Sequence, residues 1–157
     1  MKSIRWVLFF ITLVIGCLVN YLGDWIFGIR IELFYGLQTF NFIWFVQIFI
    51  WPLLVGLSVS FTYGLGGKWI AMLPPLIVRS FAYYETQHII GVPDGAFLMP
   101  AGWWAFFVIL AMEVAMIGGV FGEIVVKRIY GRSSAVEINA REEASRQAKQ
   151  SHESQAD

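Results

Sequence analysis

The chain has 157 residues, of which 58% are hydrophobic, 17% aromatic and only 14% charged, and its formal net charge is zero. Soluble domains carry about 25% charged residues, so this composition argues against an ordinary soluble domain and favours a membrane protein. Zero net charge gives no reason to expect nucleic acid as a partner. The single cysteine, Cys17, excludes an intramolecular disulfide and a cysteine-based zinc site.

Four long apolar stretches follow one another along the chain, at about residues 6–27, 42–63, 69–90 and 103–126. Crossing ~30 Å of hydrocarbon takes about 20 predominantly apolar residues in a helix. Backbone polar groups in lipid must bond within the segment, which favours helices over loops or open sheet. The sequence therefore predicts an all-α integral membrane protein, with four transmembrane helices forming a bundle over residues 1–130.

The first stretch begins like a signal sequence, with Lys2 and Arg5 ahead of an apolar run. Residues 14–17 have the shape of a lipoprotein cleavage box ending at Cys17. The apolar run continues to Phe27 with no polar linker after the cysteine, which favours an uncleaved first span. Cleavage at Cys17 stays open as the alternative.

Basic residues near the span ends predict the orientation, because cytoplasmic loops are enriched in Lys and Arg. They precede the first span, occupy the second connection and follow the fourth span, at Lys2, Arg5, Lys68, Lys127, Arg128 and Arg132. The other two connections carry Glu32 and Asp94 against a single Arg30. This pattern predicts that both termini are cytoplasmic, in a bacterial-type inner membrane.

The third stretch is the least regular, because Pro74 and Pro75 interrupt it and proline breaks hydrogen bonds in a helix interior. One alternative begins the helix near Pro74 and leaves residues 69–73 at the membrane interface. Another makes the segment re-entrant and sheltered by protein. Three full spans would place the basic cluster after the last span outside the cytoplasm, so four spans are favoured.

Residues 131–157 form a polar tail, rich in Glu, Arg, Ser, Gln and Ala, with little to bury. The spacing of Ser134 and Glu137 is that of a capping box, and Glu142 and Arg146 form a favourable i,i+4 pair. A cytoplasmic helix over about 135–149 and a disordered tail remain equal alternatives.

Small and polar residues recur every four positions in three of the stretches, which is typical of close helix packing in lipid. The stripes include Gly16, Asn20, Gly56, Ser60, Ala115, Gly118, Gly119 and Gly122. They predict packing faces inside the bundle, with a face for another subunit as the alternative.

Arg79 is the most informative single residue. A helix that begins near Trp69 places Arg79 about 15 Å along it, close to the bilayer centre. A central arginine costs about 2.5–3.5 kcal/mol on insertion scales, so it needs a partner, and Glu113 lies at a compatible depth. The sequence predicts an intramembrane Arg79–Glu113 pair; the alternatives are an arginine that reaches the cytoplasmic interface and a transport or gating role.

Asp24, Glu85 and His88 are predicted to form an outer-side polar cluster. Glu85 and His88 have the Glu-x-x-His spacing of di-iron bundles, but such sites need two copies of the motif and two more glutamates. We therefore expect no metal and no cofactor. The sequence shows no nucleophilic triad, phosphate loop or dinucleotide fingerprint, so we expect no catalytic residues.

These observations favour a non-enzymatic accessory or assembly subunit of a larger membrane complex. The expected partners are the lipid bilayer and other membrane subunits, or further copies of the chain. The alternative is a small oligomeric transporter or channel that uses the intramembrane charges of Arg79, Glu113 and Glu85.

Overall fold

The structure is a computed structural model that describes residues 2–28, 33–35, 42–92 and 97–153. It separates into two compact units, Met1–Glu123 and Ile124–Asp157. Among the described residues, three helical stretches are long and apolar enough to cross a membrane: Trp6–Phe27, Phe42–Tyr63 and Ala101–Ile129. The chain is thus an all-α protein with the apolar helices of a membrane protein.

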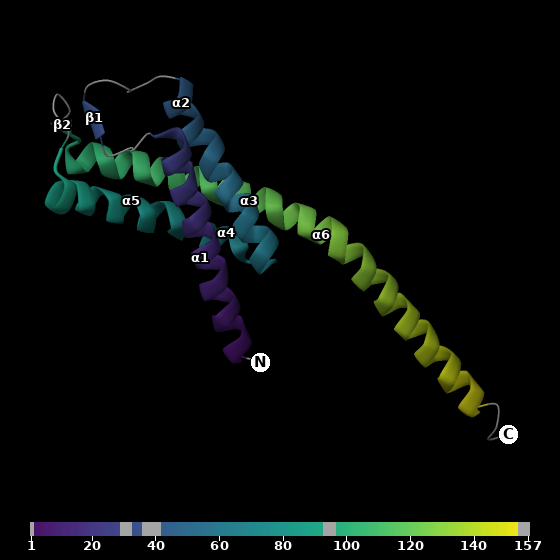
Figure 1. Ribbon diagram of the computed structural model, residues 1–157. Coiled ribbons are helices and arrows are strands. Elements are labelled where there is room, and N and C mark those ends of the chain that lie inside the picture. The colour runs from purple at the N-terminus through teal and green to yellow at the C-terminus, as the bar shows by residue number, and fades with distance from the viewer. Residues whose placement is uncertain (1, 29–32, 36–41, 93–96, 154–157) are drawn as a thin grey trace. The chain divides into compact units, whose positions relative to one another are not determined.

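Helix α1 (Lys2–Phe27) is continuous and packs against helices α3 and α5 (Figure 1). The second apolar stretch is composite, because α2 (Phe42–Phe45) passes through the π-helical turn η1 (Val46–Ile50) into α3 (Trp51–Tyr63). Pro52 explains the wider turn: its ring crowds the carbonyl four residues earlier and it has no N–H to donate. The N–H of Trp51 instead donates to the carbonyl of Val46, five residues back.

The third stretch is broken into three pieces: α4 (Gly67–Ala71), α5 (Leu73–Glu85) and the π-helical turn η2 (Thr86–Ile90). Pro74 and Pro75 lie in the first turn of α5, where proline is tolerated. Trp69 precedes this break and is 65% exposed. A helix therefore begins at Leu73, next to Pro74, while residues 67–71 form a short helix of their own rather than a non-helical segment.

Two short strands join the connection after α1 to the segment before α6. Strand β1 (Leu33–Tyr35) pairs antiparallel with β2 (Phe97–Leu98), with Leu33 opposite Leu98 and an irregularity before Tyr35. The start of the last helix therefore lies at the same end of the first unit as the end of α1.

Helix α6 (Ala101–Glu153) covers both the predicted fourth span and most of the predicted tail in one 53-residue helix. Its first part, up to Glu123, belongs to the first unit. There the Glu123 carboxylate accepts hydrogen bonds from the backbone N–H groups of Gly66 (3.0 Å) and Lys68 (3.1 Å), and the Lys68 Nζ lies 3.8 Å from it. This contact joins α6 to the turn between α3 and α4.

The small-residue stripes lie in contacts between these helices. A Cβ added at Gly56 would lie 1.9 Å from the carbonyl oxygen of Ala115, and one at Gly118 would lie 2.1 Å from that of Leu53. Added Cβ atoms at the other three glycines would also overlap neighbours, which are Pro74 and Val59 for Gly16, Lys68 for Gly119 and Ser60 for Gly122. Asn20, Ser60 and Ala115 are fully buried. These residues thus allow close helix approach within the first unit.

Two apolar clusters fill the spaces beside these contacts. One joins the second stretch to α6 through Trp44, Ile48, Met99 and Phe107, and the rings of Trp44 and Phe107 meet edge to face at 5.4 Å. The other joins α3 to α4 through Val55, Val59, Ile70 and Ala71.

We predict that Gly56→Ala destabilises the protein, because the new methyl group must displace the α6 backbone at Ala115. Overpacking of this kind typically costs about 1–3 kcal/mol. The measurement is the thermal unfolding midpoint in a mild detergent. Gly102→Ala is the matched control, since nothing lies within 4 Å of a Cβ there, and it should leave the midpoint unchanged or slightly higher. Equal midpoints for the two variants would contradict the close α3–α6 contact.

Candidate functional site

A buried charge network joins α1, η1 and α5. The Arg79 Nη1 lies 2.7 Å from the Asp24 Oδ1, and the side chains of Arg79 and Asp24 are 1% and 9% exposed. The Gln47 Nε2 donates to the same carboxylate oxygen. The Asp24 carboxylate on α1 therefore neutralises Arg79 of α5 and also accepts a hydrogen bond from the amide of Gln47 in η1.

Further buried polar side chains lie on the stripe of α1 that repeats every four residues. Thr12, Asn20, Gln47 and Arg79 are all fully buried. Several of their polar atoms find no hydrogen-bond partner among the described residues: Thr12 Oγ1, both amide atoms of Asn20, Gln47 Oε1 and Arg79 Nε and Nη2. Buried polar atoms are normally bonded to protein or to ordered water. The interior of the first unit thus contains several buried polar atoms that have no hydrogen-bond partner among the described residues, which is unusual for an apolar helical protein.

The ion partner of Arg79 is Asp24 and not Glu113, so the predicted Arg79–Glu113 pair is wrong. Glu113 is exposed on α6. The physical reason is the helix face: Ala111 and Ala115 are buried, and a residue two positions from each points to the opposite side. The side chain of Arg79 is fully buried.

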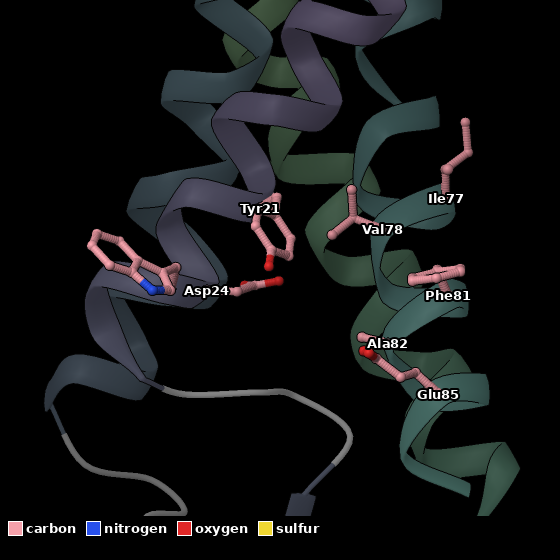
Figure 2. Close-up of a pocket in the computed structure, with 8 residues that line it drawn as sticks. Tyr21, Asp24, Ile77, Val78, Phe81, Ala82 and Glu85 are labelled. Carbon is pink, nitrogen blue, oxygen red and sulfur yellow. The ribbon is translucent and has the colours of Figure 1, made fainter. Parts of the chain in front are cut away.

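Asp24 and Glu85, two members of the predicted outer-side cluster, line one pocket of about 300 Å³ between α1 and α5. Figure 2 shows Tyr21 and Asp24 of α1 across the pocket from Val78, Ala82 and Glu85 of α5. His88 does not line this pocket, and its side chain is exposed. Its ring stacks on that of Tyr84 with 4.5 Å between the ring centroids, and its Nδ1 lies 3.2 Å from the Tyr84 carbonyl oxygen. The structure thus brings together two of the three residues.

Sequence reasoning missed Gln47 and the pairing of Asp24. Gln47 is the one amide side chain inside the second apolar stretch, five positions before Pro52, and an amide among apolar neighbours was the available signal. For Asp24 the signal was its place in the Gly16–Asn20 stripe, since a Cβ at Gly16 would meet Pro74 at the start of α5. Arg30, Glu32 and Asp94 lie outside the described residues.

No group of three or more His, Cys, Asp or Glu side chains within residues 2–28, 33–35, 42–92 and 97–153 is placed to hold a metal ion. No family model matches the sequence, and no curated protein or solved structure matches it either. The site therefore has to be interpreted from its own geometry.

We predict that Asp24→Ala and Arg79→Ala each lower stability sharply, because each leaves the other charge buried without its counter-ion. Breaking a buried pair by removing one member costs about 3–5 kcal/mol. The double variant should recover part of the loss, and thermal unfolding in detergent measures all three.

Glu113→Ala is the control for this experiment. Its carboxylate is exposed, so the midpoint of the isolated protein should not fall. The assignment of the pair would be contradicted if the stability losses of Asp24→Ala and Arg79→Ala simply added in the double variant. It would also be contradicted if Glu113→Ala lowered the unfolding midpoint as much as either of them.

Proposed function

We propose that the protein is a multi-pass membrane protein of a bacterial-type inner membrane that acts as a non-enzymatic accessory or assembly subunit of a larger complex. The observation that carries this proposal is the exposed carboxylate of Glu113 within the apolar stretch Ala101–Ile129. An exposed carboxylate in an apolar stretch is explained if this face of α6 binds a neighbouring subunit.

Glu113 is surrounded on its face by apolar side chains. Phe106, Ile109 and Ile117 are 55%, 56% and 47% exposed. Among the described residues, Glu113 has no hydrogen-bond or ion partner. An acidic side chain at the centre of a span costs about 2.5–3.5 kcal/mol if lipid surrounds it. A partner helix that brings a basic or hydrogen-bonding group to this depth removes that cost.

The small-residue stripes give less support to a partner than they did from sequence, because the contacts within the first unit already use them. The polar tail, residues 131–157, is the second segment through which we propose that partners bind. Helix α6 continues through this segment to Glu153, so a helical partner surface is the form we propose.

Two contacts support four spans with both termini in the cytoplasm. The β1–β2 pairing joins the end of α1 to the start of α6, and the proposal takes the segment from α4 to η2 as the span that runs back between them. At the opposite end, Glu123 bonds to the turn at Gly66 and Lys68. The basic residues on that side then face the cytoplasm.

This topology predicts the behaviour of fused reporters. A reporter that is active only outside the cytoplasm should stay silent after Asp157 and become active when inserted near Asp94. The same reporter inserted at Gly66 is the internal control and should stay silent. An active fusion after Asp157 would contradict the four-span arrangement.

The subunit proposal predicts that Glu113→Gln reduces co-purification of a stoichiometric membrane partner in mild detergent, by roughly tenfold if one charged contact is lost. Glu85→Gln is the matched control, because the same change there faces the α1–α5 pocket and not the exposed face of α6. Equal recovery of the partner with both variants would show that the Glu113 face is not the binding surface.

The second candidate function is a small oligomeric transporter or channel using Arg79, Glu113 and Glu85. The buried atoms of Arg79, Asn20 and Gln47 that lack partners among the described residues favour it, since intramembrane polar groups often mark ion paths. An ion or solute flux in reconstituted vesicles that Glu85→Gln reduces, in a variant that still unfolds at the wild-type midpoint, would favour this candidate. Co-purification of a partner without flux would favour the subunit.

A further inference from the structure

An exposed seam runs along the part of α6 that belongs to the first unit. Its members are spaced three or four residues apart, on the side of the helix opposite the buried Ala111 and Ala115: Phe106, Ile109, Glu113, Ile117 and Val120. We call this set the Glu113 seam. Its four apolar members are between 39% and 56% exposed. Phe106, Glu113 and Val120 are seven residues apart, which is the spacing that keeps one helix in contact with another along its length.

The seam is apolar except for the carboxylate of Glu113, which has no hydrogen-bond or ion partner among the described residues. Glu123, the other acidic residue of the stretch Ala101–Ile129, bonds to the backbone at Gly66 and Lys68. Glu113 lies about 15 Å along the helix from Glu123, at ~1.5 Å per residue, so that turn is out of its reach. A single polar residue in an apolar seam selects its partner, because a helix without a complementary group leaves it unpaired.

The complementary group would have to lie at the depth of Glu113. Copies of one chain in a membrane share one orientation, so a given residue lies at the same depth in every copy. A second copy could therefore supply a cation only from an exposed basic side chain at the level of Glu113.

The basic residues of this chain do not meet that requirement. Arg79 is fully buried and paired with Asp24, and Lys68 lies beside Glu123. Lys127 and Arg128 follow Glu123 along α6, farther from Glu113. The remaining basic residues precede or follow the apolar stretches in the sequence, at Lys2, Arg5, Arg30, Arg132, Arg141, Arg146 and Lys149. A cation for Glu113 thus has to come from a different protein.

We propose that the Glu113 seam binds a transmembrane helix of a different protein that carries an arginine or lysine at mid-span. This inference rests on the subunit proposal, since it names the chemistry of the partner at the same face. The basic side chain pairs with the Glu113 carboxylate, and the apolar seam residues on either side pack along the partner helix.

A designed peptide serves as the probe in a binding experiment with the full chain in phosphatidylcholine vesicles. The peptide is a tryptophan-free leucine–alanine transmembrane helix with a dansyl group at one end and arginine, glutamine or leucine at its centre. Its central residue stays at mid-depth whichever way the peptide inserts. Energy transfer from the tryptophans of the chain measures binding, and Trp103, which is 58% exposed on α6, lies in the turn before Phe106. We expect the arginine peptide to bind about tenfold more tightly than the leucine peptide.

Charge variants at one position identify the contact. Glu113→Gln should weaken binding of the arginine peptide about tenfold, and Glu113→Arg should abolish it. Glu113→Arg should instead bind a peptide with glutamate at its centre, which the wild type does not. Glu85→Gln is the matched control, because the same change lines the α1–α5 pocket and should bind the arginine peptide like the wild type. Equal thermal unfolding midpoints show that the variants remain folded.

Two outcomes overturn the inference but not the subunit proposal on which it rests. The first is equally tight binding of all three peptides, which would mean that the seam binds helices without selecting a basic residue. The second is self-association of the wild-type chain that Glu113→Gln abolishes, measured by sedimentation equilibrium in detergent, which would make a second copy the occupant. Absence of saturable binding by any peptide would overturn both the inference and the Glu113 face as a binding surface.

Discussion

The pairing of Asp24 with Arg79 is the constraint on which the arrangement of the first unit depends. Arg79 is fully buried among largely apolar helices, so its charge has to be neutralised within the interior. Neutralisation requires α1 and α5 to meet on one face. Gly16 and Pro74 make this possible, because a Cβ at Gly16 would overlap the proline ring at 2.6 Å. Close approach of the two backbones and the ion pair are therefore parts of one contact.

Each of the two π-helical turns carries a buried polar residue, and the one in η1 belongs to this contact. Gln47 is in η1, and Thr86, which is 2% exposed, is in η2. A π turn adds a residue to the helical turn, and such turns are often found at functional sites. Pro52 gives a local reason for η1, and Gly91, whose φ is 80° and whose N–H donates to the Thr86 carbonyl (3.1 Å), marks the end of η2. The departures from regular helix thus occur where polar groups enter the interior.

The helices and their packing glycines could be predicted from the sequence because apolar length and four-residue spacing are local signals. The partner of Arg79 could not be predicted by depth, since depth was counted along a continuous helix and the chain breaks at Met72. Helix faces carried the missing information: Asp24 shares a face with Gly16 and Asn20, whereas Glu113 lies opposite Ala111 and Ala115. Gln47 was missed because an amide within an apolar run has no characteristic spacing.

The carboxylates of Asp24 and Glu113 differ in where their partners lie: Asp24 is paired inside the first unit, whereas Glu113 is exposed on α6. Apolar side chains exposed on α1, such as Val14 and Leu18 at 56% each, need no protein partner, because lipid tails solvate them as well as a neighbouring helix does. An exposed Glu113 has no such solvent in the middle of a span. Asp24, by contrast, already has Arg79 and Gln47. A neighbouring subunit is therefore expected to recognise α6 through Glu113.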